Sequence, residues 1–167
     1  MSEVSGNTIG MNRLTICLMA AVALQTTGFG EVTKLKKEHR EALKDSSAFR
    51  EVHSTTNLQP AVIALCADEN GRLADRDKKW ETTDAITESK LPRKRFIWGA
   101  TRGEYYIIHS ERGGLAHSYH VLIATLKEGD EKAKVVWRGV GDRLNDFKAF
   151  LTTLKSNKLD DTQEYAH

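Results

Sequence analysis

The sequence predicts a single α+β domain, in which a mainly antiparallel meander sheet of about five or six strands packs against a C-terminal helix. A second helix is expected on the N-terminal side. Between residues 95 and 139, apolar segments are joined by very short turns, and such short connections force neighbouring strands to run antiparallel. Near the C-terminus, apolar residues recur at helical spacing. The 167 residues suffice for one hydrophobic core.

Residues 11–30 have the layout of a secretory signal peptide. Arg13 gives a positive start, an uncharged stretch runs from Leu14 to Leu24, and Gly28-Phe29-Gly30 offers a small-x-small cleavage signature. The stretch is shorter than the roughly 20 apolar residues of a membrane-spanning helix. We therefore expect a periplasmic or secreted protein, cleaved near Gly30, with no stable membrane span.

The polar residues 1–10 resemble no part of a signal peptide. We expect them to be a leader that is not native, with translation beginning at Met11. The alternative is that residues 11–30 form an ordinary buried helix behind a polar leader.

Charge and cysteine content exclude several classes of protein. With 25 basic and 23 acidic residues, the net charge is +2, and a nucleic-acid-binding protein would concentrate far more positive charge. Cys17 would leave with the signal peptide, so Cys66 would be the single cysteine of the mature chain and no internal disulfide could form. Cys66 lies in the apolar run 61–67, which predicts a buried, inert thiol.

The mature domain is expected to span residues 31–159. Apolar residues at three- and four-residue steps predict a helix over 31–52. Pro60 precedes an expected strand over 61–67, and Asn70-Gly71 predicts a hairpin turn into a weak return strand that starts at Arg72.

Residues 82–91 are expected to form a short helix, capped at its start by Thr82-Thr83-Asp84 and ended by Pro92.

Four further strands follow, with tight turns at 101–103 and Gly113-Gly114. Their expected ranges are 96–100, 104–111, 115–126 and 133–138. If Ala100 faces Glu104 and Arg112 faces Leu115, alternation of side chains assembles one aromatic and aliphatic core face. Its members would be Phe96, Trp98, Tyr106, Ile108, Tyr119, Val121 and Ile123. The opposite face would carry Ile97, Tyr105, Ile107, His109, His120 and Leu122, and would be only partly covered.

Residues 142–159 predict an amphipathic helix with the apolar stripe Leu144, Phe147, Phe150, Leu151 and Leu154. Gly141-Asp142 is expected to cap its start. This helix is the expected cover of the aromatic face, with Trp98 buried beneath it. Residues 160–167 are expected to be a polar tail.

Four residues are candidates for a binding surface: Tyr105, His109, Glu111 and His120. In the predicted register they share the mixed face of the sheet beside apolar residues, a composition suited to contact with a partner. His109 and His120, with Glu111 as a third ligand, also suggest a hydrolase or metal-dependent enzyme. The simplest interpretation is polar residues on a half-exposed sheet face.

Other motifs carry less information. The acidic residues between 68 and 84 do not fit a calcium loop. Lys90, Arg93, Lys94 and Arg95 surround Pro92 and suit either an anionic polymer or lipid head group, or simple solubility of a strand entrance.

Enzyme and cofactor motifs are missing from the sequence: there is no G-x-S-x-G, no H-E-x-x-H and no C-x-x-C. We therefore expect no cofactor, no resident metal and no nucleic-acid partner. The expected function is that of an exported binding protein of the inhibitor or immunity type. Its partner would be another exported protein or a second copy of the chain.

Overall fold

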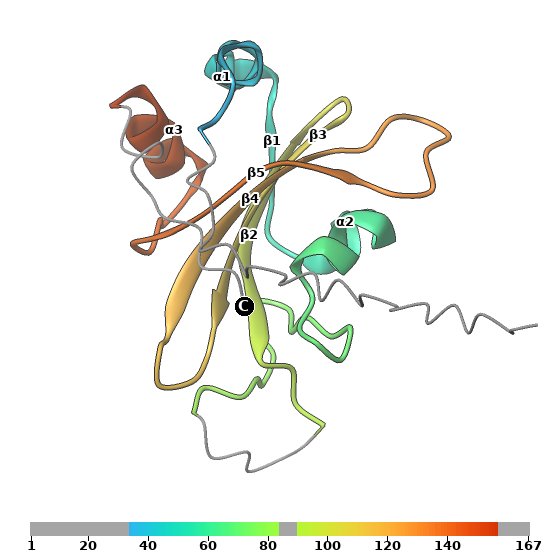
Figure 1. Cartoon of the computed structure of the whole chain (residues 1–167), viewed down its shortest axis with the longest axis vertical. Helices are drawn as coiled ribbons and strands as arrows, with labels where there is room; N and C mark the ends of the chain where they lie inside the picture. The colour runs from blue at the N-terminus through green and yellow to red at the C-terminus, as the bar shows by residue number, and fades with distance from the viewer. Residues whose placement is uncertain (1–33, 84–89, 157–167) are drawn as a thin grey trace, which may run out of the picture.

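A computed structural model describes residues 34–83 and 90–156. A five-stranded antiparallel meander forms its centre, with the strands in the order β1-β2-β3-β4-β5 (Figure 1). The strands are β1 (Arg50–Val52), β2 (Lys94–Arg102), β3 (Tyr105–Arg112), β4 (Ser118–Thr125) and β5 (Lys134–Gly141). The predicted α+β fold with a meander sheet is confirmed. The expected leader, signal segment and polar tail lie outside the described residues.

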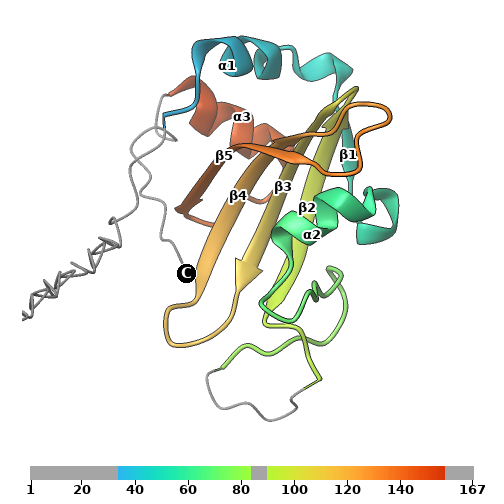
Figure 2. The same cartoon turned by 45° about the vertical axis from the view of Figure 1, so that its right-hand side comes forward.

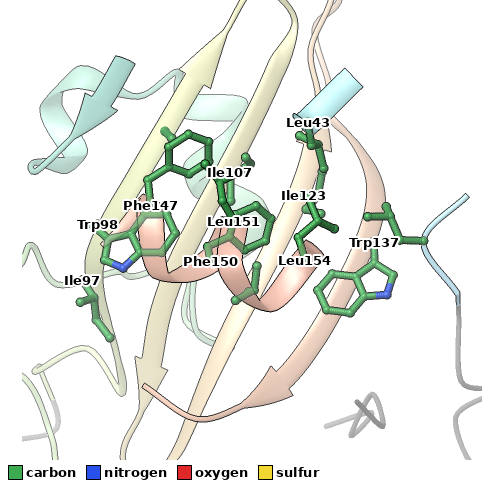
Figure 3. Packing of buried hydrophobic residues seen from close by; sticks show 13 residues of the cluster. Leu43, Ile97, Trp98, Ile107, Ile123, Trp137, Phe147, Phe150, Leu151 and Leu154 are labelled. Atoms are coloured by element: carbon green, nitrogen blue, oxygen red, sulfur yellow. The ribbon is translucent and has the colours of Figure 1, made fainter. Parts of the chain in front are cut away.

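Two helices, α1 (Lys37–Lys44) and α3 (Phe147–Lys155), cover one side of the sheet (Figure 2), which we call the α3 face. Trp98, Ile107, Ile123 and Trp137 reach this side from four different strands and meet the apolar residues of α3 (Figure 3). Trp98 is 1% exposed, and its ring contacts those of Phe147 and Phe150. Its indole nitrogen donates to the Leu144 carbonyl at 2.8 Å. The expected burial of Trp98 beneath the C-terminal helix is confirmed.

Helix α3 begins later than the sequence predicts. The carboxylate of Asp146 accepts a hydrogen bond from the Ala149 amide at 2.7 Å, so Asp146 is the N-cap rather than Gly141-Asp142. Residues 134–141 extend instead as β5. The sequence offers aspartate at both positions. The backbone of Leu144 bonds to Trp98 through its carbonyl and to His109 through its amide, which holds this residue outside the helix and leaves Asp146 as the cap.

The expected strand 61–67 is wrong: Pro60–Cys66 forms helix α2. Proline suits the first helical position, where its missing N–H is not needed. A seven-residue apolar run fits a strand or a buried helix equally well. Val62 and Cys66, four residues apart, are buried on one side of the helix against the sheet. Helix α2 covers the other side of the sheet, the α2 face (Figure 2).

The expected hairpin at Asn70-Gly71 does not form. Residues 68–71 make a turn in which Gly71 has φ +71, but in the described residues that follow, up to residue 83, the chain makes one isolated parallel bridge, between Ala74 and Arg95. The Asp68 carboxylate explains this path, because it accepts from the amides of Asn70, Arg72 and Arg93. Those bonds satisfy the loop without a strand partner.

The first helix is also shorter than expected. Within the described residues α1 ends at Lys44, and a 3₁₀ turn at Ser46–Ala48 leads into β1. Val52 pairs with Gly99 and is buried beside α2, so it does not continue the stripe of α1. Most of the expected helix 82–91, residues 84–89, lies outside the described residues. None of the helices in the described ranges is long and apolar enough to cross a membrane.

The predicted register is wrong at both tight turns. Arg102 pairs with Tyr105, so Ala100 faces Ile107 and not Glu104. Arg112 pairs with Ser118, three residues beyond Leu115. An odd shift turns every side chain of a strand to the other side of the sheet. The α3 face therefore takes Ile107 and His109 from β3, whereas Ile108 packs on the α2 face.

Phe96 also changes face, because a bulge between Phe96 and Trp98 reverses the alternation in β2. Phe96 packs against α2, while Trp98 packs against α3.

Candidate functional site

A buried carboxylate organises the loop end of the α3 face, where β3 ends and β4 begins. Glu111 is 2% exposed. Its Oε1 accepts from Nε and Nη2 of Arg95 at 2.7 and 2.6 Å, and its Oε2 lies 2.9 Å from Nε2 of His117. An ionised carboxylate only accepts hydrogen bonds, so the imidazole donates. Both oxygens of Glu111 are thus occupied, as a buried charge requires.

Aromatic rings surround these polar groups. The guanidinium of Arg95 lies 4.8 Å from the centre of the Trp80 ring, a cation–π distance. The ring centres of Trp80 and His117 are 5.9 Å apart, and those of His117 and Tyr119 are 5.0 Å apart. We call Trp80, Arg95, Glu111, His117 and Tyr119 the Glu111 cluster. Its outer members reach the surface, because the side chains of His117 and Arg95 are 44% and 28% exposed.

The loop between β3 and β4 is tied to the segment that carries Trp80. The amides of Gly113 and Gly114 donate to the carbonyls of Arg93 and Thr82, each at 3.1 Å. A Cβ on Gly113 would collide with the backbone of Glu81 and Thr82, so only glycine permits this approach. Leu115, in the same loop, has a side chain that is 97% exposed.

His109 lies in the core and not on a surface. Its side chain is fully buried between the rings of Trp98 and Tyr119. Nδ1 lies 3.0 Å from the His120 carbonyl, and Nε2 accepts from the Leu144 amide at 3.1 Å. Burial lowers the pKa of His109 to about 4 from its usual 6.5. The imidazole is therefore neutral at pH 7 and joins β3 to the segment that precedes α3.

The other two candidates lie elsewhere on the sheet. The Tyr105 hydroxyl is 2.9 Å from Nδ1 of His39, so Tyr105 packs beneath α1 at the far end of β3. His120 pairs with Ser110, which puts it on the α2 face, where its Nε2 lies 2.8 Å from the hydroxyl of Ser118. The expectation that Tyr105, His109, Glu111 and His120 share one exposed face rested on the wrong register. Three of them share the α3 face, and His120 does not.

The cluster contains a histidine oriented by a carboxylate, an arrangement that acid–base catalysis uses. In the described part of the chain, no serine, threonine or cysteine side chain is hydrogen-bonded to His117. Within those residues, no three His, Cys, Asp or Glu side chains form a group that could hold a metal ion. Burial raises the pKa of the Cys66 thiol to about 12, which keeps it protonated. The expected buried position of Cys66 is confirmed.

Comparison with known proteins found no matching family, no matching curated protein and no matching solved structure. The geometry must therefore carry the functional argument alone. Sequence reasoning found Glu111 but missed Trp80, Arg95 and His117 as its neighbours. The available signal was strand alternation: with the β2–β3 turn and the bulge between Phe96 and Trp98 placed correctly, Glu111 and Arg95 become direct cross-strand partners.

Proposed function

We propose that the protein is an exported binding protein of the inhibitor or immunity type, which docks a partner protein on the outer side of the Glu111 cluster. The observation that carries this proposal is the layer of Trp80, Arg95 and His117, which hydrogen bonds and ring contacts hold in place over a buried carboxylate. Tryptophan and arginine dominate the energetic centres of protein interfaces. A surface that is ordered before binding loses less side-chain entropy on association.

Leu115 supplies an apolar anchor beside this layer. Its side chain is exposed on a loop whose backbone is fixed at Gly113 and Gly114. A large aliphatic side chain on a fixed loop suits insertion into a pocket of a partner. The proposed export follows from the signal-like residues 11–30, and it makes other exported proteins the expected partners.

The geometry gives less support to the alternative of a hydrolase or metal-dependent enzyme. That alternative needs His109, His120 and Glu111 at one place. His109 is in the core, and His120 is on the opposite face from Glu111.

The proposal is tested first by processing. Protein expressed with its own N-terminal segment in a bacterial host should be exported, and its N-terminal sequence should begin within a few residues of Glu31. Intact MSEVSG on protein from the cytoplasm would refute the exported location.

Docking is tested with two matched variants. Leu115 and Val135 are the large apolar residues of the described chain with exposed side chains. Leu115→Asp should abolish capture of partner proteins from the host envelope after chemical crosslinking, whereas Val135→Asp, on β5, should not. The reverse result would move the docking surface to β5. Light scattering of the purified protein distinguishes a second copy of the chain from a foreign partner.

A further inference from the structure

The α2 face carries a row of polar residues at the same end of the sheet, on the opposite side from the Glu111 cluster. Lys94 pairs directly with Arg112, and Arg112 pairs directly with Ser118. Direct partners point to the same side of a sheet. In the next row, Ser110 pairs with His120. Strand alternation thus places neighbouring residues of the basic segment on opposite faces of the sheet. Arg95 lies beside Glu111 on the α3 face, and Lys94 lies beside Arg112 on the α2 face.

Two like charges directly opposite each other destabilise a sheet. Arg138 adds a third positive charge, since it pairs with Leu122 and so shares this face. The pKa of Lys94 is lowered by burial first, and then by the charge of Arg112. The arrangement therefore has an electrostatic cost, which an anion placed between these groups would relieve.

Carboxylates of the described residues do not neutralise these cations. In the described ranges none lies within 4.0 Å of the charged nitrogens of Lys94, Arg112 or Arg138. The charge of Glu69 attracts Lys94, but the ion pair of Glu69 is with Arg93, whose Nη1 lies 3.7 Å from Oε1 of Glu69. The thiol of Cys66 also lies near Lys94 but stays protonated, because burial raises its pKa.

Part of this charge has a structural role. Lys94 donates to the Ala67 carbonyl and Arg138 to the Leu65 carbonyl, each at 3.2 Å, so both stabilise the C-terminal end of α2. Each keeps further N–H donors, because an ammonium has three and a guanidinium five. In the described part of the chain, the side chain of Arg112 makes no hydrogen bond or ion pair.

We propose that this end of the α2 face binds a phosphate dianion, either free or as a phosphate monoester. Arg112 is the principal contact, because its planar fork of donors matches two phosphate oxygens. Lys94 donates from the neighbouring strand. Ser118 completes the site: when His120 carries its proton on Nε2, it donates to the Ser118 hydroxyl at 2.8 Å and leaves the hydroxyl hydrogen for the anion. A dianion suits three clustered cations better than a single carboxylate does.

The test is calorimetric titration of the whole protein with inorganic phosphate and, separately, with glycerol 3-phosphate, at pH 7.5 in a chloride buffer of matched ionic strength. We expect saturable binding of at least one of the two. Tighter binding of orthophosphate identifies a free-phosphate site, and tighter binding of the ester identifies a monoester site. No binding of either below about 10 mM would overturn the proposal.

Variants localise the binding. Arg112→Gln should weaken it by roughly 30-fold or more, and Ser118→Ala by about tenfold, as expected for hydrogen bonds to a charged ligand. Arg50→Gln, an exposed arginine on β1 at the other end of the sheet, is the matched control and should bind as the wild type does. Amide NMR shifts should cluster at Arg112 and Ser118. Equal affinity in Arg112→Gln and the wild type would show that the anion binds elsewhere. Leu115 lies in the loop between Arg112 and Ser118, so the uncharged variant Leu115→Ser is used here: it removes the apolar anchor and should leave phosphate binding unchanged, which separates this proposal from partner docking.

Discussion

The two faces of the sheet differ in how they are closed, although the same strands supply both. On the α3 face, two helices cover apolar side chains from all four long strands, and its buried polar groups, His109 and Glu111, have hydrogen-bonding partners. On the α2 face, one seven-residue helix covers an apolar centre around Phe96, Ile108 and Leu122. Toward the β3–β4 loop, the side chains on the α2 face are those of Lys94, Arg112 and Ser118. At this end of the face these three residues are partly exposed, and two of the three are cations.

This difference predicts where the folding free energy resides. Trp98→Ala removes a fully buried indole and its hydrogen bond to Leu144, and should reduce the free energy of unfolding by about 3–5 kcal/mol in urea titrations. On the α2 face, Val62→Ala removes only two buried methyl groups and should cost less than about 2 kcal/mol. A loss for Val62→Ala as large as that for Trp98→Ala would contradict this ranking.

Low pH should reduce the free energy of unfolding through His109, which is buried on the α3 face. In the unfolded chain this histidine binds a proton near pH 6.5, whereas in the folded protein it does so only near pH 4. Protonation therefore favours unfolding, and the contribution of His109 is lost as the pH falls from about 6.5 to about 4. The full loss is on the order of 3 kcal/mol.

The variant His109→Gln keeps polar atoms in the core but cannot titrate. The difference in unfolding free energy between pH 7 and pH 4.5 should be smaller in this variant than in the wild type. An identical difference in the two proteins would show that other groups cause the acid sensitivity.

The Glu111 cluster should be of intermediate importance for stability. Glu111→Gln removes the charge that Arg95 and His117 share, and should cost about 1–3 kcal/mol, because both partners are partly exposed and can be hydrated again. The environment of Trp80 should change too, and its fluorescence reports this. Glu128→Gln, an exposed carboxylate in the β4–β5 loop, is the control and should be neutral.

The smallest effect is expected at the cover of the α2 face. Arg138→Gln removes one cation from the C-terminal end of α2 and should cost about 0.3–1 kcal/mol. Hydrogen exchange of the α2 amides should accelerate, while exchange in α3 should not. Lys148→Gln, exposed on α3, serves as the matched variant. A loss above about 2 kcal/mol for Arg138→Gln would mean that a single cation holds the cover of the α2 face in place.

The sequence by itself determined the meander and helix α3, because both depend on local signals: strand segments joined by short turns, and apolar residues at helical spacing. It also determined that Trp98 and the apolar residues of α3 meet. The register error does not affect this contact. The β2–β3 and β3–β4 pairings are each shifted by an odd number of residues, so β3 changes face while β4 keeps the same orientation relative to β2.

Only the tertiary structure decided which residues of β3 face which helix. The β3–β4 loop has five residues and not two, because Gly113 and Gly114 bond to Arg93 and Thr82, which lie far away in the sequence. Tertiary contacts also decided the secondary structure of residues 60–66, since a short apolar run becomes a helix or a strand according to what it packs against. The Glu111 cluster and the cationic row follow from this register. Side chains alternate with a period of two, so a turn misplaced by an odd number of residues exchanges the two faces, and only long-range contacts fix the turn.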